Sequence, residues 1–551
     1  MRDNKTPPHP SPQETPLKHP VETPGEIRGE KPRRSLLGSS AIVGAMTMVS
    51  RILGLIRDVV FARVIGADGF ADAFFVAFKI PNFLRRLFAE GAFAQAFVPV
   101  LSEYRNEGGH AAVKALVDRV AGALGSVLIA LTLIAVIAAP MLAGLFAPGF
   151  VGDAAKFEAT TEMIRVTFPY LLFISLTGFA GGILNSYDRF AVPAFTPVWL
   201  NVCLISAALV AAPWFERPVF ALAWGVFAAG VIQMLFQIPF LATLHLLPSP
   251  KLDWQYPGVR QILRLMAPAI FGVSVSQINL LLDTVIASFL PTGSVSWLYY
   301  SDRLAELPLG VFGVAAATVI LPNLSRQHAT QSAKEFNAIL DWALRFVLLI
   351  AVPASIALMM IAEPLLAALF YDGSEIDQRD IVMAGFSLRA YALGVVAFML
   401  IKVLAPGYFA RQDTKTPVKI GLVAMAANMV MNLLFVFVLH HYFTLGHVGL
   451  ALATSLAAFL NAGLLFRGLR SRGVYRAPSG WGAFAGMLLL GNAVMAGALY
   501  IGLGQFGDWF AMSFMTRALT VLGLCGLGFA AYALTLFVCG FRLSQLRSPV
   551  K

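Results

Sequence analysis

Apolar stretches recur along almost the whole chain, and their length decides what the chain can fold into. Each runs for about 18 to 25 residues, enough for a helix to cross the roughly 30 Å hydrocarbon core of a bilayer. Because lipid offers no partner for free backbone N–H and C=O groups, the spanning backbone has to be helical. The runs are continuous and lack the alternation of a β-barrel. With 58% hydrophobic and 13% charged residues, the sequence predicts an all-α polytopic membrane protein.

About fourteen membrane spans are predicted, and the connections between them differ in charge. Lysine and arginine gather in alternate connections, as at Arg105, Lys251 and Arg411, whereas acids such as Asp372 lie in the others. The basic side is predicted to be cytoplasmic, which places both termini inside the cell. The spans are expected near 38–62, 70–101, 120–147, 162–186, 193–213, 218–244, 265–290, 295–324, 340–362, 383–405, 416–440, 447–467, 481–504 and 514–541.

Composition excludes several classes of protein. The net charge is +11, but the basic residues are scattered singly between apolar spans, so no nucleic-acid partner is expected. The three cysteines lie in apolar spans without metal-like spacing, and neither a metal nor another cofactor is expected. No connection is long enough for an extramembrane catalytic domain or carries a Walker, HExxH or GxSxG motif, which favours a transporter over an enzyme. The proline-rich segment 1–36 is predicted to be a disordered cytoplasmic tail.

Short motifs recur at a nearly constant separation. Residues 41–44 (AIVG) resemble 269–272 (AIFG), 91–102 resemble 313–325, and 196–198 resemble 416–418, with offsets of about 228, 223 and 220 residues. Such a duplication, with an even number of spans per copy, predicts two parallel six-helix lobes around a central cavity, as in alternating-access transporters. A duplicated packing unit without transport remains open. The predicted division is 37–245 (N-lobe), 246–475 (C-lobe), 476–545 (two additional helices) and 546–551 (cytoplasmic C-terminus).

Ionisable residues are dense in the first, second and eighth predicted spans. A charge at the bilayer centre costs about 2.5–3.5 kcal/mol even on lenient scales, so such residues normally face water or one another. For Arg57, Arg85 and Arg86, snorkelling toward the interface is an alternative. An excess of arginine in an aqueous cavity favours a phosphate or diphosphate ligand, because the guanidinium makes bidentate contacts and stays charged. These residues are Arg51, Arg57 and Asp58 in the first span, Asp72, Lys79, Arg85, Arg86 and Glu90 in the second, and Asp302, Arg303 and Glu306 in the eighth.

A single acid, Asp283, lies in the otherwise apolar seventh span. It fits either a cation or proton site, or a partner for a nearby arginine. Asn428, Asn432 and Thr454 could complete a sodium shell with it, although polar contacts between helices are the commoner role of such residues in membranes.

Several long strings resemble the MurJ (MviN) lipid II flippase family of the multidrug/oligosaccharidyl-lipid/polysaccharide (MOP) exporter superfamily. The resemblance covers about 38–545. The strings that carry it are Ser50-Arg-Ile-Leu-Gly-Leu-Ile-Arg57-Asp58, Asp72-Ala-Phe-Phe-Val-Ala-Phe-Lys79-Ile-Pro-Asn-Phe-Leu-Arg85-Arg86-Leu-Phe-Ala-Glu90, Ser294-Val-Ser-Trp-Leu-Tyr-Tyr-Ser-Asp302-Arg303-Leu-Ala-Glu306 and Lys402-Val-Leu-Ala-Pro-Gly-Tyr-Phe-Ala-Arg411-Gln-Asp-Thr-Lys-Thr-Pro-Val.

The resemblance implies a fourteen-helix fold in a bacterial inner membrane, with a cationic cavity and a groove of the last two helices (476–545) for the polyprenyl tail. It implies that lipid II, an undecaprenyl-diphosphate-linked disaccharide pentapeptide, is flipped to the periplasmic leaflet for peptidoglycan synthesis. The substrate would bind Arg51, Arg57, Arg85 and Arg303, and Asp283, Asn432 and Thr454 match a sodium site of some members. Partners would be lipid II, membrane lipids and other cell-wall synthesis proteins, with coupling to the membrane potential or a monovalent ion.

Three other functions remain open on the sequence. A drug or O-antigen exporter of the same superfamily would favour a site dominated by acids. A membrane-embedded cell-wall glycosyltransferase would need an acidic base beside a sizeable outer loop. A scaffold in a cell-wall complex would leave the buried arginines unexplained.

Overall fold

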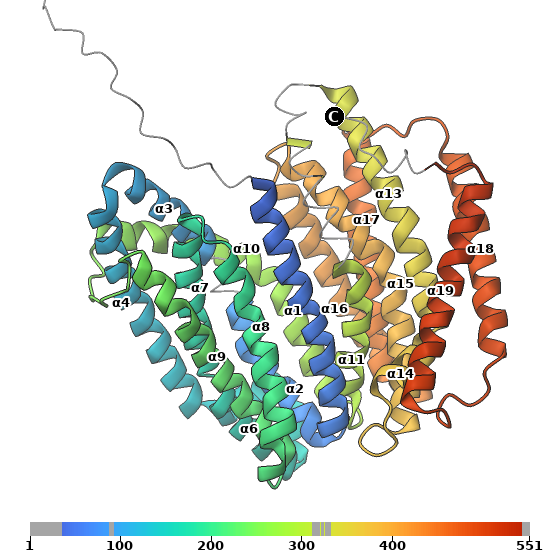
Figure 1. Ribbon diagram of the computed structural model, residues 1–551, viewed down its shortest axis with the longest axis horizontal. Helices are drawn as coiled ribbons and strands as arrows, with labels where there is room; N and C mark the ends of the chain where they lie inside the picture. The colour runs from blue at the N-terminus through green and yellow to red at the C-terminus, as the bar shows by residue number, and fades with distance from the viewer. Residues whose placement is uncertain (1–35, 87–92, 311–319, 321–323, 326–331, 543–551) are drawn as a thin grey trace, which may run out of the picture.

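The computed structural model describes residues 36–86, 93–310, 320, 324–325 and 332–542. The expectations for the tail before residue 36, for Glu90 and for 546–551 lie outside these residues. The described chain is helical, and most of its helices run between the upper and lower faces of the molecule in the view of Figure 1. α1 begins and α19 ends at the upper face, so the chain crosses the molecule an even number of times between them.

The described residues of the first half of the molecule form nine α-helices. They are α1 (Leu36–Ile65), α2 (Gly69–Leu84), α3 (Phe93–Glu107), α4 (Gly109–Ile137), α5 (Ala139–Phe146), α6 (Ala154–Thr167), α7 (Tyr170–Ser186), α8 (Ala191–Ser206) and α9 (Pro218–Thr243). A short 3-10 turn, η2 (Pro148–Gly152), joins α5 to α6.

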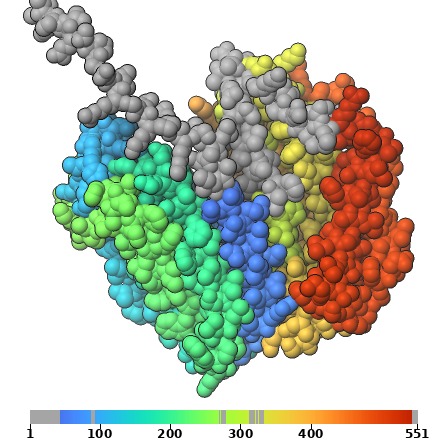
Figure 2. All heavy atoms as spheres, in the orientation of Figure 1, coloured from blue at the N-terminus to red at the C-terminus, as the bar shows by residue number. Residues whose placement is uncertain are grey.

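The second half begins with α10. Its described helices are α10 (Pro257–Ser288), α11 (Ser294–Pro308), α13 (Ala333–Met360), α14 (Ala362–Phe370), α15 (Gln378–Phe409), α16 (Lys415–Phe443), α17 (Gly446–Ser471), α18 (Trp481–Gly504) and α19 (Phe514–Val538). The space-filling view shows α18 and α19 on the outer flank, away from the first half (Figure 2).

The order of elements in the two halves repeats, in agreement with the motif offsets. A 29-residue α4 followed by an 8-residue α5 corresponds to a 28-residue α13 followed by a 9-residue α14. Helices α9 and α17 are both 26 residues long. Equivalent pairs of helices also pack together in the two halves. The packing of α1 on α8 corresponds to that of α10 on α16, and the packing of α7 on α9 corresponds to that of α15 on α17. The duplication read from short motifs is therefore visible in the architecture.

The expected number of fourteen spans is not confirmed. By length and composition, ten helical stretches of the described residues can cross a membrane. Predicted spans 38–62, 70–101, 265–290 and 295–324 are not among them. All four run into residues that are not fully described. Within 70–101, α2 ends at Leu84 and α3 begins at Phe93, and residues 87–92 between them lie outside the described part of the chain.

The apolar surface of the bundle faces outward, as a bilayer requires. Ile137 on α4, Phe437 on α16 and Phe537 on α19 are each more than two thirds exposed. A soluble protein would bury such side chains, and contiguous exposed apolar surface marks contact with lipid or another protein. The exposed faces and the spans together describe a multi-pass membrane protein.

Helix α10 belongs to both halves. Near its start, Val259 and Ile262 are buried in one apolar cluster with Leu116 of α4. Near its end, Asp283 accepts a hydrogen bond from Asn432 of α16. The helix has 32 residues, or about 48 Å at 1.5 Å per residue, and therefore exceeds the thickness of a bilayer core.

Candidate functional site

A central cavity of about 390 Å³ lies between α2, α10, α11, α15 and α17. Four cations and two acids line it, which leaves an excess of two positive charges. The apolar lining includes Phe75, Phe78 and Leu281. Such a mixture of apolar walls and a few converging charges is typical of a ligand site. The charged lining residues are Lys79, Arg86, Asp302, Arg303, Glu306 and Lys402.

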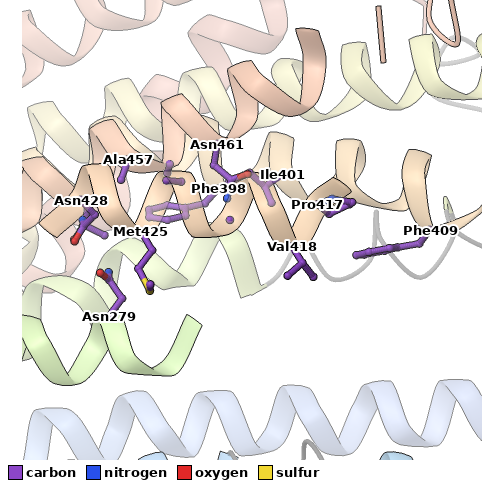
Figure 3. Close-up of a pocket in the computed structure, with 14 residues that line it drawn as sticks. Asn279, Phe398, Ile401, Phe409, Pro417, Val418, Met425, Asn428, Ala457 and Asn461 are labelled. Carbon is purple, nitrogen blue, oxygen red and sulfur yellow. The ribbon is translucent and has the colours of Figure 1, made fainter. Parts of the chain in front are cut away.

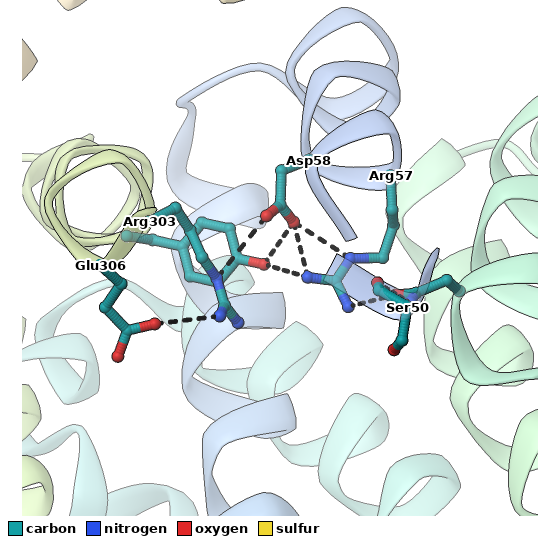
Figure 4. A network of polar contacts seen from close by, with 7 residues as sticks. Ser50, Arg57, Asp58, Arg303 and Glu306 are labelled. Atoms are coloured by element: carbon teal, nitrogen blue, oxygen red, sulfur yellow. Dashed lines mark hydrogen bonds and ion pairs between the residues drawn. The ribbon is translucent and has the colours of Figure 1, made fainter. Parts of the chain in front are cut away.

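Beside this cavity, Asp58 of α1 joins the two halves of the molecule (Figure 4). Its carboxylate accepts hydrogen bonds from Arg57 Nε at 3.0 Å and Nη2 at 2.7 Å, and from the Tyr299 hydroxyl at 2.8 Å. The Arg303 Nε lies 3.6 Å from the other carboxylate oxygen, and Arg303 also approaches Glu306 at 3.6 Å. Asp58 therefore positions both an arginine of its own helix and the cavity arginine of α11.

Arg57 is held by protein groups on every side. Besides Asp58, its guanidinium donates to Asn201 Oδ1 at 3.1 Å and to the Tyr299 hydroxyl at 3.2 Å. Asn201 is fixed in turn, since its amide donates to the carbonyl of Ser50. Arg57 is only 5% exposed, so the snorkelling alternative for this residue is wrong. Its buried charge is compensated by Asp58 rather than by water.

The four arginines expected to bind substrate do not converge on one cavity. Arg303 lines the central cavity. Arg57 does not line it, but contacts Asp58 and Tyr299, which in turn contact Arg303. Arg51 is exposed, with its guanidinium against Gly310 at the end of α11. Arg85 follows α2 and donates from Nε and Nη2 to Asn82 at 3.0 and 2.7 Å. In this conformation Arg51 and Arg85 stand apart from the cavity lining.

At the lower end of the molecule, Asp72 of α2 binds the beginning of α11. Its carboxylate accepts from the backbone N–H of Gly293 at 2.9 Å, from the backbone N–H of Ser296 at 2.9 Å and from the Ser296 hydroxyl at 2.7 Å. Lys156 of α6 donates to it at 3.1 Å. Asp72 is 1% exposed and Lys156 7%. A carboxylate at a helix N-terminus is favoured by the helix dipole, and here the cap comes from the other half of the molecule.

Further contacts close the same end. The hydroxyl of Tyr300 donates to the carbonyl of Gly66 at 2.9 Å, and the N–H of Gly149 donates to the Ser288 hydroxyl at 3.1 Å. Gly66 has φ +62° and lies against the backbone of Glu375, where a Cβ would collide. The two halves are therefore joined tightly at the lower end of the molecule.

The residues expected to form a sodium site are linked to one another by hydrogen bonds. Asn432 donates to Asp283 at 2.6 Å and to Asn428 Oδ1 at 2.9 Å, and Asn428 donates to Thr454 at 3.5 Å. The buried Oδ1 of Asn432 has no hydrogen-bond partner. An unpaired buried amide oxygen next to a carboxylate fits a monovalent cation, which prefers oxygen ligands. Among the described residues, no group of three or more His, Cys, Asp or Glu could hold a metal ion.

A second cavity, also of about 390 Å³, adjoins the central one between α10, α15, α16 and α17 (Figure 3). Phe398, Ile401 and Thr454 line both cavities. Most of its other lining is apolar, with amides from Asn279, Asn428 and Asn461. The charged cavity is thereby extended by a less polar chamber on the side of the second half.

Sequence reasoning missed three functional residues. Lys402 lines the central cavity and is a cation inside a predicted span, so the rule that found Arg303 could have found it. Tyr299 joins Asp58, Arg57 and Arg303, but a tyrosine in an apolar span gives no signal of this kind. Lys156 lies between two predicted spans, and only the fold shows its buried pair with Asp72.

Two bundles of helices that repeat one architecture, with a cationic cavity between them and a tight closure at one end, define a membrane transporter. The sequence profile of the family described as "Lipid II flippase MurJ" matches residues 61–520. The chain belongs to this family. It is 49% identical to the probable lipid II flippase MurJ of Vibrio cholerae over 94% of this chain and 99% of the relative.

Other comparisons agree with this assignment. The chain is 42% identical to the lipid II flippase MurJ of Burkholderia cenocepacia over 92% of this chain and 98% of the relative. A solved structure described as lipid II flippase MurJ in an inward closed conformation matches with a TM-score of 0.75 at 26% identity, over 90% of this chain and 98% of that one. A multidrug-resistance MATE transporter of the MOP superfamily, in an inward-facing conformation, matches with a TM-score of 0.63 at 16% identity over 79% of this chain and 98% of that one. The latter likeness extends to the fold alone.

Proposed function

We propose that this protein flips lipid II from the cytoplasmic to the periplasmic leaflet for peptidoglycan synthesis. The observation that carries the proposal is the cavity with excess positive charge between the two halves, in a chain that belongs to a flippase family. Inside a membrane, water cannot balance the negative charge of a diphosphate, so cationic side chains have to do so. The isoprenoid tail can stay in the bilayer throughout. The protein is a transporter, and no covalent step is needed.

The diphosphate binds first to Arg303, assisted by Lys79, Arg86 and Lys402. All four line the central cavity, and a guanidinium can contact two phosphate oxygens at once. Asp58 and Tyr299 orient Arg303 from behind, so the network in Figure 4 acts by positioning.

The other three arginines expected to bind substrate lie outside this diphosphate site in the present conformation. Arg57 balances the charge of Asp58 at the back of the network. Arg51 lies two turns nearer the upper face and meets the headgroup on entry. Arg85 joins the site only after it releases Asn82.

Transport proceeds by alternating access. In the conformation described here, the contacts of Asp72, Gly66 and Gly149 hold the lower end closed. We assign this end to the periplasm, because the connections rich in lysine and arginine belong to the upper face. Rocking of the halves would break these contacts and expose the headgroup outside. An inside-negative potential favours this movement by roughly 2.3 kcal/mol per negative charge and 100 mV.

The topology completes the proposal. The protein lies in the bacterial inner membrane with both termini in the cytoplasm. Its lobes correspond to 37–245 and 246–475, and the polyprenyl tail lies along 476–545, which includes α18 and α19. A monovalent cation at Asp283, Asn432 and Thr454 couples to the cycle, and the unpaired oxygen of Asn432 supports this assignment.

Complementation of a strain depleted of its own lipid II flippase tests the function. Wild type should restore growth, whereas Arg303→Ala and Lys402→Ala should fail at equal membrane expression. Arg467→Ala removes an exposed cation of α17 outside the cavity lining and serves as the matched control. If wild type inserts and does not restore growth, the substrate assignment is wrong. If both cavity variants restore growth as well as the control, the assigned site is wrong.

A further inference from the structure

A second basic cavity, separate from the transport cavity, lies where α13 begins. Its volume is about 850 Å³, and it is formed by the start of α13, the turn after α15 and the segment after α17. Lys334, Arg411, Arg472 and Arg476 line it together with Asn337, and its lining includes no acid. Small-molecule sites span about 300–1,000 Å³, so this cavity has the size of one.

The walls of this cavity are fixed by specific hydrogen bonds. The Asn337 side chain donates to the Arg476 carbonyl at 3.0 Å and accepts from the Arg476 N–H at 2.7 Å, which ties the segment after α17 to α13. Gly473, at φ +68°, turns the chain between the end of α17 and Arg476. Arg472 donates to Asp413 at 2.6 Å and to Thr416 at 3.1 Å. The cavity is therefore a built feature of the C-terminal half.

The positive charge of this cavity is only partly compensated. Asp413 pairs with Arg472, but in the described part of the chain no carboxylate lies within ion-pair distance of Lys334, Arg411 or Arg476. Ala333 and Lys334 contribute the first turn of α13 to the lining, and the N-cap Ser332 makes no side-chain capping bond. The free N–H groups and the dipole of a helix N-terminus add further positive potential.

Membrane topology accounts for the number of cations at this face but not for their convergence. The positive-inside rule counts lysine and arginine in connections and is indifferent to where the side chains meet. Here exposed cations from three separate segments surround one concavity, and a bound anion would offset the repulsion between them. We propose that this cavity binds a phosphate-bearing anion. Arginine supplies paired donors to phosphate oxygens and lysine supplies a point charge.

The phosphate group can come from a soluble compound or from the headgroup of an anionic phospholipid. A bound phosphate would link α13 to the α15–α16 turn and to the connection that leads into α18. Both sources can be tested with the full-length protein in nanodiscs. All measurements use the Arg303→Gln background, so that anion binding in the transport cavity contributes less to the signal.

The first arm uses phosphatidylcholine nanodiscs and measures binding of radiolabelled inorganic phosphate. The second uses nanodiscs that also contain phosphatidylglycerol, and counts retained phosphatidylglycerol by native mass spectrometry. The test variant is Arg411→Gln/Arg476→Gln. The control, Arg470→Gln/Arg467→Gln, removes the same charge from exposed positions of α17 outside the cavity.

We expect the test variant to lose about 10-fold or more in affinity in at least one arm, as for the loss of charge-assisted hydrogen bonds. A loss in the first arm alone identifies a soluble anion, and a loss in the second alone identifies a lipid headgroup. If the test and control variants behave alike in both arms, the proposal is overturned. If the double variant does not fold, Lys334→Gln, at the exposed first turn of α13, replaces it. Its affinity should also fall, but by a smaller factor.

Discussion

Replacing Asp72 by asparagine should open the lower end of the transporter. The carboxylate receives three hydrogen bonds from Gly293 and Ser296 of the opposite half and one from Lys156. The Asp72→Asn side chain keeps the size but loses the charge, and it leaves the ammonium of Lys156, only 7% exposed, without its counter-ion. Breaking a buried pair in this way costs about 3–5 kcal/mol. Because each 1.36 kcal/mol is a factor of ten, a loss of about 3 kcal/mol changes the ratio of closed to open molecules roughly 150-fold.

The change can be measured as labelling of the central cavity from outside. A cysteine at Ala305, which lines the cavity, would report in a protein whose three native cysteines are replaced by alanine. We expect a membrane-impermeant thiol reagent, added to the periplasmic side of spheroplasts, to label this cysteine faster by up to about 100-fold in the Asp72→Asn variant.

The matched control is Asp153→Asn. Asp153 is an exposed acid that caps α6, and the hydrogen bond that it accepts from the Lys156 N–H stays within its own half. Its replacement should leave the labelling rate unchanged. Equal rates for wild type and Asp72→Asn, with both proteins folded, would refute the assignment of Asp72 to the closure of this end.

Three further predictions concern separate parts of the molecule. Tyr299→Phe removes the hydroxyl that donates to Asp58 at 2.8 Å and should lower the free energy of unfolding by about 0.5–1.5 kcal/mol; an unchanged denaturation midpoint would argue against this bond. In the turn before α16, hydrogen bonds from the threonine three residues later lower the pKa of Asp413 to about 2. A lowered folded-state pKa stabilises the protein above the ordinary carboxyl pKa of about 4 and loses this effect as the pH falls toward 2. The difference in melting temperature between wild type and Asp413→Asn should therefore shrink from pH 5 to pH 2, and a constant difference would contradict the assignment. Sodium should raise the melting temperature relative to potassium in wild type but not in Asp283→Ala, and the absence of any sodium effect in wild type would exclude the proposed cation site.

The sequence predicted the membrane class and most of the helices because both depend on local patterns. Apolar runs set the spans, and the cost of charge in lipid directed attention to Asp58, Asp72 and Arg303, all of which have polar partners. Four of the predicted spans are not confirmed, and each of them includes residues that are not fully described.

Partners far apart in the chain could not be predicted. Asp72 lies 224 positions from Ser296 and 84 from Lys156, and no periodicity connects such residues. The geometry also separated arginines that the sequence had grouped, since Arg57 is held by protein groups while Arg51 is exposed. Their side chains point as tertiary contacts dictate, and a single helix pattern does not contain that information.

The two halves of the molecule hold opposite ends of one long helix, α10. They cannot turn relative to each other unless α10 changes shape or gives up its contacts at one end. Pro268 lies between the two contact regions, and proline removes a backbone hydrogen bond and weakens a helix where it stands. The continuous helix therefore connects the motions of the two halves as well as crossing the membrane. Its stiffness limits how far one half can move before the other moves with it.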